Sequence, residues 1–394
     1  MSRLRAIAVN LALVVFSVLL ADLFLHACDG LAGKYLARTL QTGRFGLLFE
    51  PGLEGHSKMH DYECREIINS LGFRDHEVSL NKGKAFRIVA LGDSFTYGWG
   101  VNLEETWCKR LEANLRQKGL DVEVLNLGKP AAGPEEYARI AHVVLPVLKP
   151  DMVLIGILNG DDLQQCFSPI LMALRHHPNL GRLYQYWKTR AARNGPYTPP
   201  KQSADDMRAW FARSAKDILD GMGPKMRARY DALEPAVKEA FLEGTLNPWL
   251  ISHSTGEPDY FMNTVSPRRL RFPVFMMTHY LRRIHKAAWR EGAPVLALSI
   301  PEGFYVNDAA YRNVQRIGFQ VVPEMLTTHA VDDAVGEACR RAGIPFISVL
   351  DEMRRHRGRS DLYLELDRHF SPAGNALYAD LITDAVAERI ARAR

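Results

Sequence analysis

A serine stands where a strongly apolar segment of the sequence stops abruptly. The segment, residues 86–92 (FRIVALG), predicts a buried strand, and Asp93 and Ser94 follow it at once, with two glycines shortly beyond (FTYGWG). A serine hydroxyl attacks a carbonyl carbon only when a base removes its proton. A strand that fixes Ser94, followed by small residues that leave space for a tetrahedral intermediate, makes this serine the candidate nucleophile.

His369 and Asp367 supply the base and the carboxylate that such a serine needs. They stand two residues apart, and in an extended segment side chains at that spacing point to the same side. The carboxylate would hold the imidazole in the productive tautomer and stabilise it once protonated. Each residue alone has an ordinary interpretation, Ser94 as a helix cap and the pair as a surface contact. Together they predict a Ser94–His369–Asp367 catalytic triad.

Two further loops carry groups that could stabilise the negative oxygen formed when a carbonyl is attacked. Such an oxyanion needs hydrogen-bond donors. The stretch NLGKPAAG (126–133) leaves backbone N–H groups uncovered, and the stretch NGDD (159–162) offers the Asn159 side-chain amide. The backbone N–H of Ser94 is a third donor. The loops therefore predict acyl-transfer chemistry around this serine.

Alternating strands and helices must position these groups. The predicted strands are apolar throughout, which is typical of a parallel sheet covered by helices on both faces. The strands span residues 86–92, 122–128, 151–158, 293–300 and 344–350, and the helices span 104–119, 134–149, 331–343 and 371–393. In such a sheet functional groups collect at the carboxyl ends of the strands. The loops that carry the candidate residues are therefore expected side by side.

The sequence divides into an N-terminal segment (1–27), a linker with short strands and turns (28–80) and an α/β domain (81–394), which a mostly helical insertion (163–290) interrupts. The insertion contains aromatic residues that either stack on sugar rings or pack its own helices, and arginines that either attract an acidic glycan or form a solvated basic face. These are Tyr184, Tyr186, Trp187, Trp210, Trp249 and Tyr260, and Arg268, Arg269 and Arg271.

The N-terminal segment predicts a membrane anchor. Residues 6–27 are mostly apolar and long enough to cross a hydrocarbon layer of about 30 Å as a helix. Arg3 and Arg5 precede them, and the positive-inside rule then leaves the N-terminus in the cytoplasm. We expect a single-pass bacterial inner-membrane protein with its catalytic domain in the periplasm or outside the cell. Cleavage of the segment as a signal peptide, or lipidation at Cys28, remains an alternative.

Composition excludes several other classes of protein. The 394 residues are 47% hydrophobic and 24% charged, which is typical of a globular chain with a sizeable core. The net charge of +5 comes from scattered Lys and Arg, without the basic stripe of a nucleic-acid-binding protein. The five cysteines lack metal-ligand spacing, so no metal site is expected. Oligomeric state has no signal in the sequence.

The motifs resemble those of the SGNH (GDSL) hydrolase family. GDSFTYG (92–98) resembles its first block, with Ser94 as nucleophile, NLGKPAAG (126–133) its second, GDD (160–162) its third and DRH (367–369) its last. The resemblance implies a flavodoxin-like three-layer α/β/α sandwich. It further implies hydrolysis or transfer of an ester acyl group without a metal or organic cofactor.

Three positions depart from the family pattern. Ala131 stands where the second block normally presents a glycine whose N–H serves the oxyanion, and that N–H survives the change. Asp161 stands where the third block normally has an asparagine, and an ionised carboxylate cannot donate a hydrogen bond. Asn159 could replace it by a two-residue shift. The spacing from Asp367 to His369 is one residue shorter than usual.

The anchor together with the stretch NSLGFRD (69–75) resembles a membrane-anchored subgroup of bacterial envelope proteins in this family. The resemblance implies an esterase that removes acyl groups, with acetyl the expected one, from an envelope polysaccharide or related ester. One alternative is an O-acyltransferase that uses the same site on a surface glycan. The other is a glycan-binding or assembly protein whose catalytic site has decayed.

Overall fold

The computed structural model describes residues 48–166 and 203–393, together with positions 13, 16, 17 and 20. The rest of the predicted anchor (6–27), Cys28 and the first part of the predicted insertion lie outside the described residues. Within the described part of the chain, no helix has the length and apolar character needed to cross a membrane.

The core is a five-stranded parallel sheet with the strand order β4-β3-β5-β6-β7. The strands are β3 (Phe86–Gly92), β4 (Val122–Gly128), β5 (Met152–Leu158), β6 (Val295–Ile300) and β7 (Phe346–Ile347). Every residue of β3, β5 and β6 is buried, as the unbroken apolar runs predicted. The chain runs outward from β3 in both directions, which is the flavodoxin-like doubly wound order.

The predicted strand at 344–350 is shorter in the structure, where only two residues pair with β6. Ser348 ends it because its hydroxyl accepts from the Leu350 N–H at the start of α16 (Leu350–Arg354) and donates to Asp332. The chain therefore turns into a helix as soon as it leaves the sheet edge.

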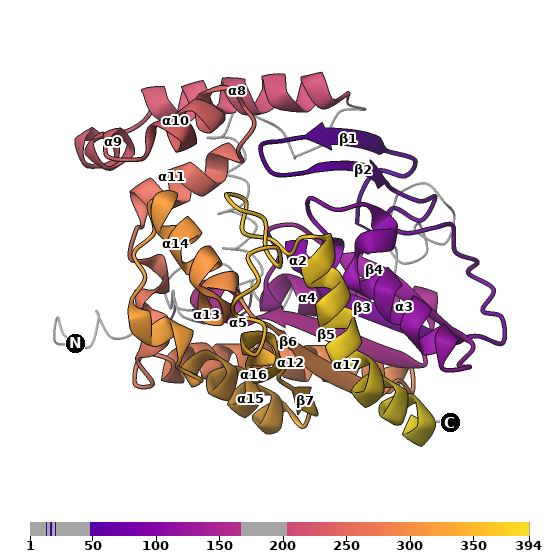
Figure 1. Cartoon of the computed structure of the whole chain (residues 1–394). Helices are drawn as coiled ribbons and strands as arrows, with labels where there is room; N and C mark the ends of the chain where they lie inside the picture. The colour runs from indigo at the N-terminus through magenta and orange to yellow at the C-terminus, as the bar shows by residue number, and fades with distance from the viewer. Residues whose placement is uncertain (1–12, 14–15, 18–19, 21–47, 167–202, 394) are drawn as a thin grey trace, which may run out of the picture. The chain divides into compact units, whose positions relative to one another are not determined.

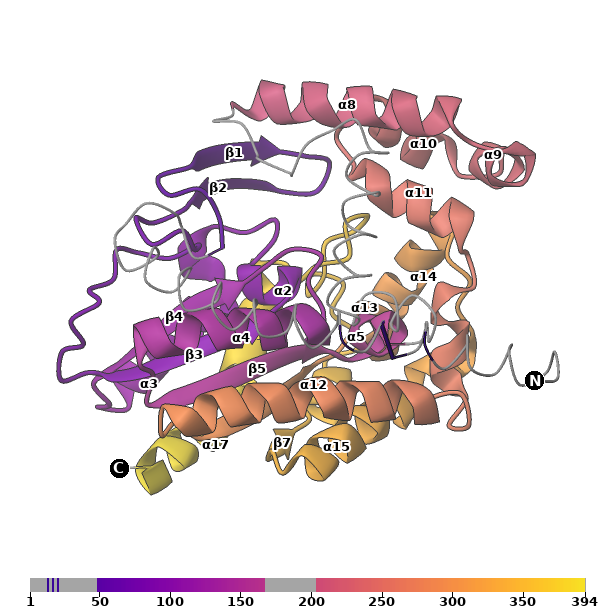
Figure 2. The same cartoon turned by 180° about the vertical axis from the view of Figure 1, so that it is seen from behind.

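Helices cover both faces of the sheet, so the predicted three-layer arrangement is confirmed (Figures 1 and 2). α3 (Trp107–Gln117) packs against α17 (Pro372–Ala393) on one face. α12 (Arg271–Arg290) packs against α4 (Pro134–Leu148) and α15 (Ala330–Ala342) on the other. The remaining short helices are α2 (Ser94–Tyr97), η1 (Leu103–Glu105), α13 (Gly303–Val306), α14 (Asp308–Arg316) and η3 (Pro323–Leu326).

α5 (Asn159–Gln165) begins before the predicted insertion (163–290) and leads into it. The described part of that range further contains α8 (Ala204–Asp220), α9 (Pro224–Asp231), α10 (Pro235–Leu242), α11 (Pro248–Gly256) and η2 (Tyr260–Val265). The last twenty residues of the predicted range 163–290 form α12, which covers the sheet and leads directly into β6. In the structure the added helices therefore end near residue 270.

Residues 48–80, predicted as part of a linker, fold onto the domain. Two short strands, β1 (Glu54–Lys58) and β2 (Glu63–Ile67), form an antiparallel hairpin beside α8 (Figure 1). Met59, in the hairpin turn, packs with Met207 and Phe211 of α8. The hairpin thus connects the inserted helices to the α/β domain.

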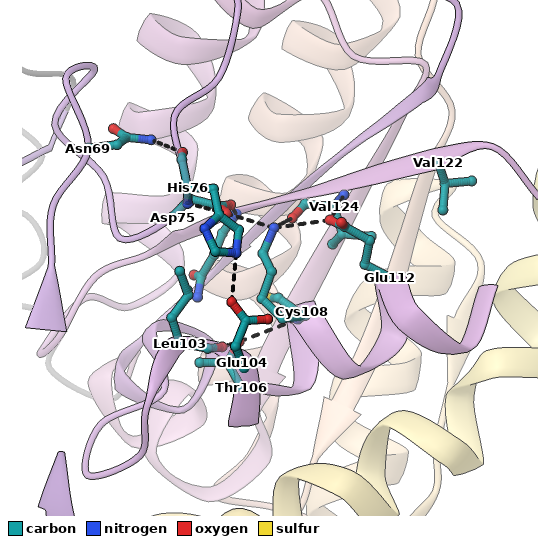
Figure 3. Close-up of polar contacts among 12 residues, drawn as sticks. Asn69, Asp75, His76, Leu103, Glu104, Thr106, Cys108, Glu112, Val122 and Val124 are labelled. Carbon is teal, nitrogen blue, oxygen red and sulfur yellow. Dashed lines mark hydrogen bonds and ion pairs between the residues drawn. The ribbon is translucent and has the colours of Figure 1, made fainter. Parts of the chain in front are cut away.

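A buried charge cluster closes the free edge of β4 (Figure 3). The Lys109 ammonium lies 2.6 Å from an Asp75 carboxylate oxygen and 3.0 Å from one of Glu112, and it donates to the Val124 carbonyl at 2.7 Å. The two carboxylates in turn accept the N–H groups of Asn126 and Val124. Edge-strand amides that would otherwise be unpaired are thereby satisfied.

Replacing Lys109 with Met should destabilise the fold strongly. The helix-forming tendency is nearly unchanged, but the buried Asp75 carboxylate loses its counter-charge and Glu112 keeps only Arg116, which costs about 3–5 kcal/mol. Urea unfolding would measure the loss. Lys118→Met is the matched control, because its pair with Asp384 is 47% and 88% exposed and should contribute less than about 1 kcal/mol. Equal losses in both variants would contradict this account of the cluster.

Candidate active site

Ser94 begins α2, the four-residue helix that follows β3. Asp93 caps this helix by accepting the Phe95 N–H at 2.9 Å, and Gly98 ends it in a left-handed conformation with φ of 84°. The helix lies directly on the end of β4, where a Cβ on Gly128 would stand 2.1 Å from the Tyr97 nitrogen. Ser94 itself is half-buried among buried neighbours, so its hydroxyl is held firmly and remains accessible.

The predicted contact between Ser94 and His369 is present. His369 Nε2 lies 2.7 Å from Ser94 Oγ, and His369 Nδ1 contacts Asp367 Oδ1. The Asp367 side chain is 3% exposed and that of His369 is 16% exposed. The order carboxylate, imidazole and hydroxyl allows the ring to accept the serine proton while the buried carboxylate orients it.

Two backbone N–H groups near the serine are available as donors. Residues 129–132 form a turn closed by the Ala132 N–H on the Lys129 carbonyl, and the Lys129 N–H holds this turn against the Gly92 carbonyl at the end of β3. Ala131 occupies the left-handed position of the turn with φ of 59°, which explains why a glycine is usual there. Among the described residues, the N–H groups of Ser94 and Ala131 have no recorded acceptor.

The prediction of Asn159 as an oxyanion donor is wrong. Asn159 is fully buried, its amide donates to Asp332 Oδ1 at 2.7 Å, and its carbonyl oxygen accepts the Glu302 N–H at 3.3 Å. Asp332 also accepts the Ser299 hydroxyl. Asn159 therefore links the start of α5 to the loop after β6 and to α15, and its amide is bound to a carboxylate.

Asp161 keeps the place that the third block gives it but makes acceptor contacts only. Its two carboxylate oxygens accept the Tyr260 hydroxyl at 2.9 Å and the Gln165 amide at 2.8 Å. Gln165 in turn packs against Gly133 of the second loop. The loops after β4 and β5 therefore meet, as the sequence predicted, and one of the predicted insertion aromatics, Tyr260, orients the carboxylate.

The structure adds residues around Asp367 that carried no sequence signal. The Trp99 indole N–H donates to Asp367 Oδ2 at 3.2 Å, on the oxygen that His369 leaves free. Asp61, in the β1–β2 turn, accepts the backbone N–H groups of Leu366 and Asp367 at 2.7 and 3.2 Å. Burial, and after it the Asp367 charge, raises the pKa of Asp61.

The stretch NSLGFRD (69–75) supports the loop that follows the serine. The fully buried Arg74 guanidinium donates to the carbonyls of Tyr97, Gly98 and Val101 and stacks over the Tyr97 ring. These carbonyls lie at the C-terminal end of α2, where a helix has unsatisfied acceptors and favours a cation. The role of this stretch in the described structure is thus to fix the backbone next to Ser94.

A second buried carboxylate lies close to the imidazole. Glu302 is fully buried, and neither of its carboxylate oxygens has a hydrogen-bond partner in the described part of the chain. Its nearest counter-charge is Arg368, at 3.6 Å, which stands between Asp367 and His369 in a left-handed conformation and lies over Phe261 and Phe319. Burial raises the pKa of Glu302 to about 7, although the positive charge of Arg368 acts to lower this pKa.

The described residues contain no cluster of His, Cys, Asp or Glu that could hold a metal ion. The four cysteines among them are buried free thiols, namely Cys64, Cys108, Cys166 and Cys339.

No family model and no curated protein matches the chain. Among solved structures, it resembles the psychrotrophic esterase EstA from Pseudoalteromonas sp. (14% identity, TM-score 0.38, 78% of this chain and 99% of that one). It also resembles the lipase/acylhydrolase from Enterococcus faecalis (15%, 0.38, 77% and 96%) and the acetyl xylan esterase AlAXEase (12%, 0.36, 76% and 99%). At these TM-scores the matches carry no argument about activity or substrate.

Replacing Glu302 with Gln should change how stability depends on pH. Because the folded pKa of Glu302, about 7, exceeds its ordinary value of 4.5, the folded state holds more protons than the unfolded state between these values. The free energy of unfolding of the wild-type protein should therefore fall as pH rises from 4.5 to 7. The Gln variant lacks this titrating group, so its free energy of unfolding should not show this fall. Its relative stability should rise by about 2 kcal/mol across the window.

Urea unfolding at several pH values would measure this difference. The control is Glu239→Gln, which changes an exposed glutamate of α10. A constant difference between wild type and Glu302→Gln over the window would contradict the assignment.

Proposed function

We propose that this chain is a serine ester hydrolase of the SGNH (GDSL) type. The observation that carries the proposal is the Ser94–His369–Asp367 arrangement, with 2.7 Å between the hydroxyl oxygen and the imidazole nitrogen. The position of the serine in the fold also supports the proposal. Ser94 is half-buried at the carboxyl end of an inner strand of the sheet, where doubly wound proteins have their functional sites.

The reaction follows from the arrangement. His369 Nε2 takes the Ser94 proton as Oγ bonds to the ester carbonyl carbon, and the carbonyl π electrons move to its oxygen. The tetrahedral intermediate collapses, the alcohol leaves with the proton from the imidazolium, and the acyl group stays on Ser94. Water then bonds to the acyl carbon as the same imidazole takes its proton. The bond to Ser94 Oγ breaks, the carboxylic acid leaves, and the imidazolium returns its proton to Oγ. Asp367 stabilises the imidazolium in both steps.

Two backbone donors serve the oxyanion in this proposal. Ser94 N–H belongs to the first turn of α2, whose positive end favours a developing negative charge. Ala131 N–H is presented by the neighbouring turn. Asn159 has no part in it, because its amide is bound to Asp332. In this proposal the donors to the oxyanion are therefore main-chain N–H groups rather than a side-chain amide.

The contacts of Asp161 favour a substrate that carries free hydroxyl groups. A carboxylate has about four acceptor sites, of which Tyr260 and Gln165 occupy two. The remaining sites suit hydroxyl donors, as a sugar offers, better than they suit an oxyanion. We therefore propose an acylated carbohydrate, with acetyl as the acyl group, as the substrate class. An envelope polysaccharide and a periplasmic location remain parts of this proposal that rest on the sequence motifs and the predicted anchor.

Replacing Ser94 with Ala should abolish hydrolysis of an acetyl ester such as p-nitrophenyl acetate, because the nucleophile is lost. We expect kcat/KM to fall by about 10³-fold or more, with an unchanged unfolding midpoint. Ser79→Ala, at an exposed residue outside the stretch NSLGFRD (69–75), is the control and should keep full activity. Undiminished turnover in Ser94→Ala would refute the proposal. Absence of turnover in both the wild type and the variant would favour the decayed glycan-binding alternative.

The same assay separates hydrolysis from acyl transfer. Adding a de-acetylated polysaccharide as acceptor should leave acetate as the main product for an esterase. Accumulation of acetylated polysaccharide at the expense of acetate would instead support the O-acyltransferase alternative with the same serine.

Asp61→Ala should lower kcat without raising KM. Asp61 fixes the backbone of Asp367 and touches no reacting atom, so its loss should misplace the base without weakening substrate binding. We expect kcat to fall by about tenfold, since two buried N–H groups lose their acceptor. Asp61→Asn keeps an acceptor oxygen and should restore most of the rate. Equal damage by both substitutions would assign the effect to charge rather than to positioning.

A further inference from the structure

The outer face of α12 has a composition unlike the rest of the surface. α12 lies between α4 and α15 and turns one side to the sheet, burying Val274, Met277, Leu281, Ile284 and Ala288 (Figure 2). The opposite side is open to solvent. We call this side the α12 outer face; it comprises Arg271, Phe272, Phe275, His279, Arg282, Arg283, Lys286, Trp289 and Arg290.

Charge on this face is of one sign. The twenty residues of α12 include no Asp, Glu, Asn or Gln, and four arginines and a lysine lie on its outer face. In the described part of the chain, Arg271, Arg283, Lys286 and Arg290 have no recorded ion pair. Burial, and after it the positive charges of Arg283 and Arg282, lowers the pKa of His279. The face therefore presents uncompensated cations.

Large aromatic side chains are exposed among these cations. Phe275 is 63% exposed and Trp289 is 74% exposed, and Phe272, at the start of the helix, is 36% exposed. Phe275 and Trp289 are fourteen residues apart, which places them about 21 Å apart along the axis and within about 40° of the same side. Phe275 and Trp289 thus stand toward the two ends of one helix face, with His279, Arg282 and Lys286 exposed between them.

We propose that the α12 outer face lies on an anionic lipid surface. Aromatic and basic residues together on one helix face are the composition of interfacial membrane helices. The rings enter the boundary between headgroups and acyl chains, while the cations meet the lipid phosphates. The opposite side of α12 is buried against the protein core, so only this face is available to such a surface.

An acidic polysaccharide fits this face less well. Sugar hydroxyls donate to acceptors such as carboxylate and amide oxygens, and α12 carries neither type of side chain. A lipid surface needs only cations and apolar side chains, which are what the face offers. The predicted membrane anchor at residues 6–27 is an independent reason to expect a nearby bilayer, and stable membrane attachment commonly needs two such signals.

A fluorescent probe on the face tests the proposal in the full chain. The environment-sensitive dye NBD would be attached to Phe275→Cys in a Cys28→Ser background, since the other four cysteines are buried. The protein would be reconstituted in nanodiscs of phosphatidylcholine alone or with phosphatidylglycerol. A blue shift with brighter emission is expected in the anionic discs only. High salt should weaken the signal, because it screens the cations.

Two variants serve as controls. NBD at Glu239→Cys reports an exposed site on α10, on the far side of the domain from α12 in both views, and should not respond to lipid charge (Figures 1 and 2). Adding Arg283→Glu and Lys286→Glu to the Phe275→Cys protein should remove the blue shift. Both substitutions are at exposed positions, and an unchanged unfolding midpoint would show that the fold survives.

Equal spectra of the Phe275 probe in neutral and anionic discs would overturn the proposal. So would a response to polygalacturonate in solution without a response to phosphatidylglycerol, which would assign the face to an acidic glycan. A response at position 239 as large as at position 275 would also overturn it, because the effect would then not belong to α12.

Discussion

One hydrogen bond between residues 275 positions apart in the sequence defines the site: the contact between His369 and Ser94. Neither partner could hold it alone, since Ser94 begins a helix of only four residues and His369 lies on the loop before α17. The serine is fixed because β3 is buried and α2 is capped at both ends. The imidazole is fixed because its other nitrogen contacts Asp367, which Trp99 and Asp61 hold in place.

The segment before the sheet contributes much of this rigidity. Asp61 holds the backbone of the acid–base loop, Arg74 holds the carbonyls after the serine, and Asp75 belongs to the cluster that closes β4. All three come from residues 48–80. This segment therefore holds the loops at the carboxyl end of the sheet in place. Its hairpin also contacts the inserted helices.

The sequence predicted what local pattern and chain topology determine. Apolar runs located the strands, and parallel pairing brought Ser94, His369 and Asp367 together. Asn159 was misassigned because residue type alone does not tell which way a side chain at a strand end points. Asp61 and Trp99 were missed because the residues that they contact lie about 300 and 270 positions away in the sequence. Local sequence patterns do not predict contacts at such separations. The anchor remains a prediction.

The most direct test of the account is covalent trapping with a serine-reactive phosphonate, followed by mass spectrometry of the digested protein. The account predicts one modified peptide carrying the phosphonyl group on Ser94, and loss of labelling when His369 is replaced by Ala, because the hydroxyl then lacks its base. Labelling that spares Ser94, or that persists at the same rate without His369, would contradict it.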